Sequence, residues 1–528
     1  MKSQQILTNG QILTSQGDRF FSGELHLAGG TIQRVIQGNP GDRPPGAEVI
    51  DLNSQYLLPG LTDAHIHLRR TALNLSKIDC ETPTKQECLE RVRERAQITP
   101  PGEWILGHGW NQNTWETGFG TAADLDQAAP LHPVYLTAKS LHAAWANTRA
   151  LQAADLRASH PDPEGGRFSR DPRGKLTGIL FENAMSLVED ILPEPDESQS
   201  AEAIFEAQTY LWKMGLTAVH DFDRSRCFGA LQLLQNQGRL KLRVLKQIYT
   251  DHFQAAASVG LRSGFGNDFL KIGGVKIFAD GALGPQTAAM LDPYQDQSEN
   301  LGMLLLSPGE LGERCLRAVD QGFSLAVHAI GDRANRVVLD ALETVRAHEK
   351  SLGLPARRHR IEHVQLLHKD DLDRLADLDV IASMQPIHAP SDREIAERWW
   401  GERARYAYAW RSLLTERTLL AFGSDAPVEN PNPFWGIYAA VTRRSHRDAS
   451  QESWYPQEAL SRQQALTAYT RGPAFAAGWE EKTGQLKEGF WADLIVLDRN
   501  PFRCSLDQLA DLTPTATMVN GEFVWRSF

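Results

Sequence analysis

Two histidines separated by one residue follow an apolar run in LPGLTDAHIHLRR, which covers residues 58–70. Alternate side chains of a strand point to the same face, so His65 and His67 share a face with Asp63. Each imidazole carries a donor and an acceptor that need partners, which makes such a pair costly in an apolar core. Neutral imidazole is also the commonest metal ligand. The pattern indicates a metal site, although H-x-H is short enough to occur by chance.

Four further residues that can bind a metal follow other β-prone runs. They are Lys276 in GGVKIFADG, His328 in FSLAVHAIGD, His363 in RHRIEHVQ and Asp425 in LLAFGSDAP. If the runs are parallel strands of a barrel, these positions lie at or near the carboxyl ends of the strands, where active sites of that fold are built. We therefore expect the four residues to converge with His65 and His67.

Eight β-prone runs alternate with helix-like segments between residues 58 and 475. The runs are LTDAHIH, LTAVHDFD, KLRVLKQIY, GGVKIFADG, FSLAVHAIGD, RHRIEHVQ, DVIASMQP and LLAFGSDAP. Segments such as GELGERCLRAVDQG read as crossover helices. Eight parallel strands joined by helices predict an α/β fold of the (β/α)₈ barrel type. An open doubly wound sheet is the alternative, disfavoured because no G-x-G-x-x-G turn opens the segment.

Both chain ends are rich in β-prone runs with glycine-containing turns. Asn9-Gly10, Gly29-Gly30 and Asn520-Gly521 each separate two such runs and predict hairpins. Neither end is long enough for its own core, so we expect residues 1–57 and 476–528 to form one composite β-sandwich domain. The barrel domain then covers residues 58–475, with an inserted α/β subdomain at about 70–212, after the first barrel strand.

The composition excludes several classes of protein. A net charge of −11 and the lack of basic runs argue against nucleic acid as a partner. The five cysteines are widely spaced without a C-x-x-C motif, which is typical of reduced thiols in a cytosol. The first residues lack the apolar run of a secretory signal, and no run is long enough to span a membrane. We expect a cytoplasmic protein that acts on a small molecule.

Seven motifs carry a resemblance to a known family. They are PGLTDAHIHL, HAAWANTRAL, GGVKIFADGALG, AVHAIGDRA, RIEHVQ, SMQPIH and FGSDAPVENPNP. The sequence resembles the amidohydrolase superfamily of metal-dependent hydrolases, and within it the amidohydrolase 3 branch that includes N-substituted formamide deformylase. The resemblance covers nearly the whole chain, and it also implies a homodimer.

The resemblance implies a role for each of the six residues. His65, His67, His328, His363 and Asp425 correspond to metal ligands. Lys276 corresponds to a lysine that in many members is carboxylated by CO₂, forming N6-carboxylysine, and bridges two metal ions. The alternative for Lys276 is an ordinary cation that binds a substrate carboxylate beside a single ion. The donor set suits zinc, with manganese or iron left open.

The same resemblance and the positions of other polar residues suggest a substrate pocket. The candidates are Trp110, His142, Asp280, Gln385 and His388. Structural alternatives are core packing for Trp110, a helix cap for the segment around His142 and a simple turn for Asp280.

The predicted function is hydrolysis of a non-peptide C–N bond, in an N-acyl or N-formyl amine, a cyclic amide or a urea. A zinc-type ion supplies hydroxide near neutral pH, and Asp425 serves as general base and then as general acid. The alternative is a divergent barrel that acts as an isomerase or as a non-catalytic binding protein. All six ligand positions are filled, which favours the hydrolase.

Overall fold

The computed structural model describes residues 4–17, 19–38, 43–112, 115–116, 118–138, 143–163, 166–448 and 450–527. The chain forms two compact units. One consists of Met1–Thr71 and Ser200–Phe528, and the other of Ala72–Gln199. Three sheets organise them: a parallel eight-stranded sheet and a mixed sheet in the first unit, and a six-stranded sheet in the second.

The parallel sheet contains the eight strands that the sequence predicts, which confirms the parallel barrel. In sheet order they are β6 (Leu61–Ile66), β13 (Leu216–Asp221), β14 (Arg243–Tyr249), β15 (Leu270–Phe278), β16 (Leu325–Ala329), β17 (Arg360–His363), β18 (Ile381–Met384) and β19 (Leu420–Phe422). A parallel bridge between Ile66 and Ala426 brings the end of β19 back to β6. The carboxyl ends of the strands therefore meet around one rim.

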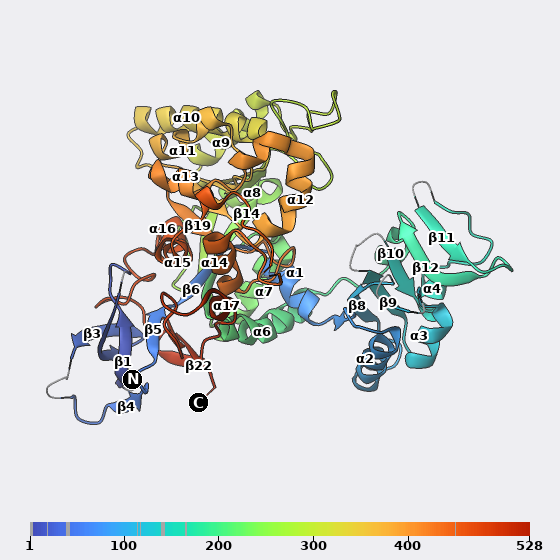
Figure 1. Cartoon of the computed structure of the whole chain (residues 1–528), viewed down its shortest axis with the longest axis horizontal. Helices are drawn as coiled ribbons and strands as arrows, with labels where there is room; N and C mark the ends of the chain where they lie inside the picture. Colours follow the sequence, from blue (N-terminus) through green and yellow to red (C-terminus); the bar gives the residue numbers. More distant parts are fainter. Residues whose placement is uncertain are drawn as a thin grey trace. The chain divides into compact units, whose positions relative to one another are not determined.

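Helices follow most barrel strands (Figure 1). The helices after barrel strands are α1 (Leu68–Leu75), α7 (Ser225–Asn236), α8 (Thr250–Ser258), α9 (Pro308–Asp320), α10 (Asp332–Ser351), α11 (Arg374–Asp377), α12 (His388–Trp400), α13 (Trp410–Thr415), α14 (Pro433–Thr442), α15 (Arg462–Ala468) and α16 (Arg471–Ala477). Helix α6 (Glu197–Lys213) precedes β13, and α17 (Leu506–Ala510) lies in the C-terminal segment after the barrel.

Helix α9 illustrates how local sequence sets these elements. Ser307 and Glu310 form a capping box, in which each side chain accepts a hydrogen bond from the other residue's backbone N–H. The buried residues Leu311, Cys315 and Ala318 follow the spacing of one helix face. The helix therefore starts at a defined residue and packs its apolar face on the barrel.

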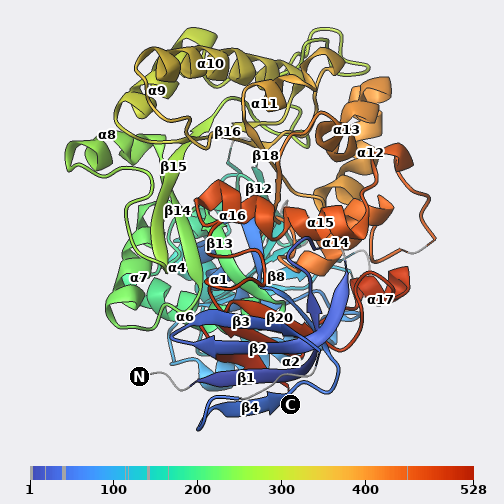
Figure 2. The ribbon, with the colours of Figure 1, turned by 90° about the vertical axis from the view of Figure 1, so that its left-hand side faces the viewer.

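The chain ends meet in one mixed sheet. Its order is β22 (Glu522–Arg526), β21 (Ala516–Val519), β20 (Leu494–Leu497), β5 (Tyr56–Pro59), β1 (Gln5–Leu13), β2 (Phe20–Ala28) and β3 (Thr31–Gln37), with β4 (Glu48–Asp51) also paired to β1. Figure 2 shows β20 beside the N-terminal strands. Leu25 and Ile32 share a hydrophobic cluster with Leu494 and Met518, so both ends contribute to one core.

The hairpin predicted at Asn9-Gly10 is wrong. Strand β1 runs straight through these residues, and the register of its pairing with β2 shifts between Leu7 and Gly10. Before the bulge β1 pairs with β4, and after it with β5. The Asn-Gly pair thus lets one strand change partners along one edge, a role that bulges often have. The turns at Gly29-Gly30 and Asn520-Gly521 do connect adjacent antiparallel strands.

A buried ion pair joins the barrel to the mixed sheet. Arg243, at the start of β14, donates two hydrogen bonds to Asp493, one of them 2.9 Å long from Nη2 to Oδ1. Both side chains are 1% exposed. The guanidinium also lies 3.6 Å from the centre of the Trp491 ring.

We expect Asp493→Ala to lower the free energy of unfolding by about 3–5 kcal/mol, because it leaves a buried arginine without its counter-ion. Urea denaturation followed by fluorescence measures the change. The control is Asp498→Ala, which removes a surface pair with Arg499 and should change stability by less than about 1 kcal/mol. Equal effects of the two substitutions would contradict the importance of the buried pair.

The second unit is an α/β structure. Its sheet order is β11 (Gly166–Arg170), β12 (Leu176–Glu182), β10 (Ala143–Ala146), β9 (Val134–Ala138), β8 (Ile105–Trp110) and β7 (Ile78–Asp79), accompanied by α2 (Lys85–Ile98), α3 (Ala122–Ala128), α4 (Thr148–Ala153) and α5 (Ser186–Glu189). Among the described residues, no helix in either unit is long and apolar enough to cross a membrane.

Candidate metal centre

Three predicted ligands converge at the rim of the barrel. Asp425 Oδ1 lies 3.6 Å from His65 Nε2 and 3.3 Å from His67 Nε2. Two ligand atoms about 2.1 Å from one tetrahedral ion lie about 3.4 Å apart, so these separations fit a shared ion. Asp425 Oδ1 is buried and has no hydrogen-bond partner among the described residues. An orphaned carboxylate oxygen between two imidazoles fits a metal ion as the missing partner.

The other predicted ligands line the same cavity, whose volume is about 310 Å³. The ring centre of His363 lies 5.0 Å from that of His65 and 4.6 Å from that of His328. Lys276 also lines the cavity. The structure therefore brings all six predicted residues to one place, although only His65, His67 and Asp425 have ligand atoms that all lie within 4.8 Å of one another.

Hydrogen bonds on the far side of the rings orient two of the imidazoles. His65 Nδ1 lies 2.7 Å from Glu362 Oε2, and His363 Nδ1 lies 2.8 Å from Gln385 Oε1. Both partners accept hydrogen bonds, so each Nδ1 carries the proton and each Nε2 keeps its lone pair for a metal. The His65 ring also stacks on Phe222 at 3.8 Å.

Glu362 is held ionised beneath the centre. Burial by itself raises the pKa of Glu362, but the Arg360 guanidinium and the hydrogen bond from His65 hold that pKa well below its usual range. Arg360 Nε donates to Glu362, and Arg360 Nη1 lies 2.8 Å from His220 Nδ1. The result is a fully buried polar network that fixes the position of His65.

Backbone conformation contributes to the placement of two of the predicted ligands. His363 has a φ of 74° and Asp425 a φ of 59°, in the left-handed region that residues other than glycine seldom adopt. Such strain persists only where surrounding contacts impose it, and it is concentrated at functional sites. Here the Asp425 backbone N–H donates a 2.7 Å bond to His65 O, which ties the end of β19 to β6.

The histidines differ in charge. Burial lowers the pKa of His65 to about 4 and that of His328 to about 3, which keeps both in the neutral form that binds metals. Burial acts in the same direction on His67, but the carboxylates of Asp223 and Asp425 raise its pKa to about 9. An ion that binds at His67 must therefore displace a proton.

Lys276 extends from β15 into the cavity and is 1% exposed. Its Nζ lies 4.8 Å from the ring centre of Phe222 and 4.7 Å from that of Phe278. No carboxylate of the described residues approaches Nζ within the 4.0 Å of an ion pair. Burial lowers the pKa of Lys276 to about 8, against the attraction of Glu362 and Asp425.

The residues predicted to bind substrate are placed differently. His388 lines the cavity, with Nε2 3.1 Å from Ser424 O. Gln385 does not line the cavity but accepts a hydrogen bond from Nδ1 of His363, which does. Trp110 lies in the hydrophobic core of the second unit, where its Nε1 donates a hydrogen bond to Leu136 O. His142 lies outside the described residues.

Asp280 is buried and its carboxylate points to the backbone. It accepts hydrogen bonds from the N–H groups of Ala289, Ile330 and Gly331. It is not part of the cavity lining, although its Oδ1 lies 3.6 Å from Nε2 of the lining residue His328. Burial raises the pKa of Asp280 to about 7, against the effect of these bonds. The carboxylate holds together the loops that follow β15 and β16.

Sequence reasoning missed Glu362, Asp223 and the walls of the cavity. Glu362 stands beside His363 in RIEHVQ, two residues after Arg360. A charged pair at alternate positions of a buried strand was the available signal, because such charges need partners in the interior. Asp223 carried a weaker signal, as the second acid in HDFD (residues 220–223), two residues beyond the end of β13.

A second group of potential ligands lies beside the centre. Asp221, Asp223 and Cys227 have ligand atoms within 4.8 Å of one another. Lys246 Nζ lies 2.7 Å from Asp221 Oδ2 and also donates to the Asp223 carbonyl. The protein's own ammonium thus supplies the cation for this group.

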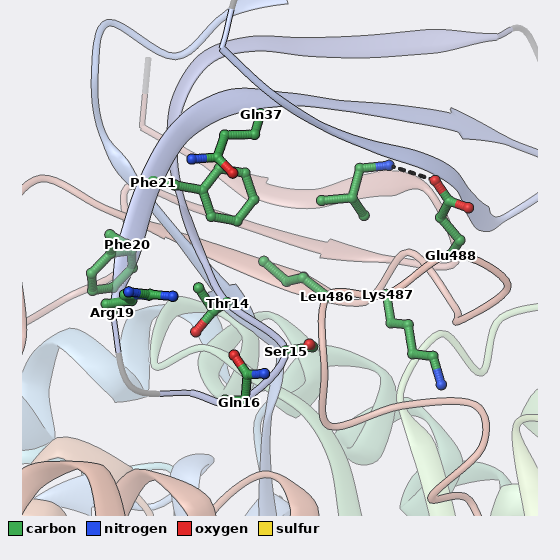
Figure 3. A pocket seen from close by; sticks show the side chains of 11 residues that line it. Thr14, Ser15, Gln16, Arg19, Phe20, Phe21, Gln37, Leu486, Lys487 and Glu488 are labelled. Atoms are coloured by element: carbon green, nitrogen blue, oxygen red, sulfur yellow. Dashed lines mark hydrogen bonds between the residues drawn. The ribbon is translucent and has the colours of Figure 1, made fainter.

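A larger hollow of about 700 Å³ lies on the mixed sheet, away from the histidines. Figure 3 shows its lining, which includes Phe21, Leu486 and Lys487. Glu488 accepts a hydrogen bond from the backbone N–H of Val35. This surface lacks the imidazole and carboxylate cluster of the barrel rim.

Comparison with known proteins agrees with this geometry. The model of the Amidohydrolase family matches residues 48–525. The chain is 33% identical to a putative amidohydrolase, YtcJ, of Bacillus subtilis (strain 168), over 91% of each protein. It is 30% identical to N-substituted formamide deformylase of Arthrobacter pascens, over 91% of this chain and 90% of that protein.

A solved structure shares the fold. The crystal structure of an uncharacterized metal-dependent hydrolase from Pyrococcus furiosus is 31% identical, covers 95% of this chain and 100% of its own, and superimposes with a TM-score of 0.76. These matches extend over both the barrel and the mixed sheet. The chain belongs to the amidohydrolase family.

Proposed function

We propose that the chain is a metal-dependent hydrolase of a non-peptide C–N bond, in an N-acyl or N-formyl amine or a cyclic amide. The observation that carries the proposal is the convergence of two imidazole nitrogens on the unpartnered Asp425 Oδ1. Membership of the amidohydrolase family supports it. The deformylase relative, which by its name acts on N-substituted formamides, supports the choice of amide substrates.

The residues divide the work as follows. His65, His67, His328, His363 and Asp425 would hold one or two divalent ions, with zinc the best match to imidazole and carboxylate donors. A bound ion of this kind makes water acidic enough to ionise near neutral pH and polarises a carbonyl group. Asp425 accepts a proton from the attacking water and returns it to the leaving nitrogen, since its Oδ1 accepts no hydrogen bond from the described residues. Glu362 keeps His65 in the required tautomer.

The size and lining of the cavity suit a small organic amide. A volume of about 310 Å³ is at the lower end of small-molecule sites. Apolar side chains form much of the wall beyond the ligands, among them Phe278, Leu283 and Ile330. These side chains favour a substrate that has an apolar portion beside the scissile bond.

We expect the zinc-loaded enzyme to hydrolyse at least one class in a panel of N-formyl amines, N-acetyl amines, cyclic amides and ureas. Chelation should lower the rate by about 10²-fold or more, because metal activation accounts for several kcal/mol of the barrier. Released amine and metal content are measured in parallel, and zinc added back should restore turnover. Activity unaffected by complete metal removal would contradict the proposal. Tight metal binding without turnover of any C–N substrate would favour an isomerase or a binding protein.

A further inference from the structure

One face of α12 forms part of the cavity wall. His388, Asp392 and Ile395 follow the i, i+4, i+7 spacing of a single helix face, and all three line the cavity. The adjoining face, with Ala389, Ala396 and Trp400 buried, packs into the protein. Asp392 is therefore presented to the space in which a substrate binds.

The Asp392 carboxylate is fixed through one oxygen only. Oδ2 accepts a 2.7 Å hydrogen bond from Gln365 Nε2 and a second from the Tyr408 hydroxyl. Tyr408 is 2% exposed, and its backbone N–H donates to Gln365 O at 2.8 Å, so the two donors form a rigid support. Oδ1 accepts no hydrogen bond from the described residues and is not among their buried unpartnered atoms, so it is open to the cavity.

Asp392 also lacks a counter-ion. No basic side chain of the described ranges lies within 4.0 Å of it. The neighbouring Arg393 is engaged elsewhere, 3.4 Å from Glu397 and in a hydrogen bond to Glu452 O. Both donors to Oδ2 are neutral. A carboxylate in a small, largely apolar cavity gains most from a cation, because charge-assisted hydrogen bonds are stronger there than in bulk water.

We propose that Asp392 binds a cationic group of the substrate, so that the preferred substrates are amides whose short apolar chain ends in a protonated amine. The inference rests on the proposed function, since it assigns the substrate of the same site. The amide carbonyl lies at the histidines and Asp425, the apolar chain along the aliphatic wall, and the ammonium at Asp392 Oδ1. Asp392 is thus a specificity-determining residue.

The test compares two amides of equal length. N-acetyl-1,4-diaminobutane ends in an ammonium and N-acetyl-n-pentylamine in a methyl group, and the matching N-formyl pair is measured alongside. We expect kcat/KM of the zinc-loaded enzyme to be about tenfold or more higher for the ammonium member. Asp392→Asn keeps an acceptor for Tyr408 and Gln365 but removes the charge. It should abolish most of this preference through KM, with little change in kcat.

Glu429→Gln is the matched control. Glu429 is a second carboxylate near this helix, but it is bonded to Ser391 Oγ at 2.6 Å and does not line the cavity. Its replacement should leave the preference unchanged. A purely structural role of Asp392 would instead lower stability and reduce turnover of both amides equally. An unchanged ratio in Asp392→Asn overturns the proposal.

A binding measurement separates this inference from the proposed function. If the enzyme hydrolyses none of the amides, calorimetry with n-pentylammonium and with 1-pentanol still tests the subsite. Preferential binding of the cation by the parent protein, lost in Asp392→Asn, supports the subsite even without amide hydrolysis. Equal binding of cation and alcohol by both proteins refutes it.

Discussion

Asp425→Ala is expected to lower kcat/KM for the amide substrate by about 10³-fold or more and to reduce the metal content of the protein. The substitution removes a carboxylate oxygen that lies within 3.6 Å of both His65 Nε2 and His67 Nε2. It also removes the proposed proton acceptor, a contribution of about 10²–10⁴ in rate by itself. Steady-state kinetics and elemental analysis of the purified variant measure the two effects.

Asp425→Asn separates the two roles. The amide oxygen can still contact a metal but is a poor base, so this variant should retain more metal than Asp425→Ala while kcat stays low. Asp448→Ala is the control, because the carboxylate of this exposed aspartate accepts its hydrogen bonds from nearby Ser450 and Gln451 and does not line the cavity. Full activity and full metal content in Asp425→Ala would refute the assignment of the centre.

Lys276→Ala is expected to reduce bound metal from two ions to about one per chain and to lower turnover, with partial rescue by acetate or propionate. Two divalent ions about 3.5–4 Å apart repel each other unless an anion lies between them. Asp425 is the carboxylate whose oxygen lies within 4.8 Å of ligand nitrogens of His65 and His67, whereas the other described carboxylate of the cavity lining, Asp392, comes from α12 and is not in that group. A carbamate on Lys276 would supply the second anion from β15. Metal counts with and without added carboxylic acid provide the measurement.

Lys276→Arg distinguishes the carbamate from a plain cation. Arginine keeps the positive charge but does not form the carbamate, so the carbamate hypothesis predicts loss of the second ion in this variant too. Carbon-13 NMR with labelled bicarbonate should show a carbamate signal in the parent protein and none in either variant. If Lys276→Arg is fully active and Lys276→Ala still binds two ions, Lys276 is a cation that serves substrate binding.

The barrel could be predicted because its signals are local. Each strand is a short apolar run, each helix such as α9 carries its own cap and apolar face, and parallel strands place their carboxyl ends at one rim by geometry. The gathering of His65, His328 and His363 in one cavity follows from that rule without knowledge of any contact. Residue type and position within a strand were sufficient to predict that these histidines lie close together.

Local signals gave a wrong prediction where the same residue pair is compatible with two structures, a hairpin turn and a bulge. Asn9-Gly10 is the strongest short hairpin signal, yet in this chain the pair forms a bulge in β1. The choice between turn and bulge depends on β4 and β5, which pair with β1 on either side of Gly10 and follow it in the chain by more than thirty residues. Propensity describes which conformations a dipeptide tolerates, and the strands available for pairing decide which of those conformations forms.

Contacts between distant residues account for the remainder of the site. Glu362 orients His65 across 297 positions of the chain, and Arg243 pairs with Asp493 across 250. The support of Asp392 by Gln365 and Tyr408 comes from two separate loops. Hydrogen bonds and ion pairs act over a few ångströms and leave no periodicity in a sequence, whereas burial does. The sequence pattern therefore specified the barrel and the predicted ligand residues. Folding determined which groups orient those residues, which groups set their charge and which groups line the cavity.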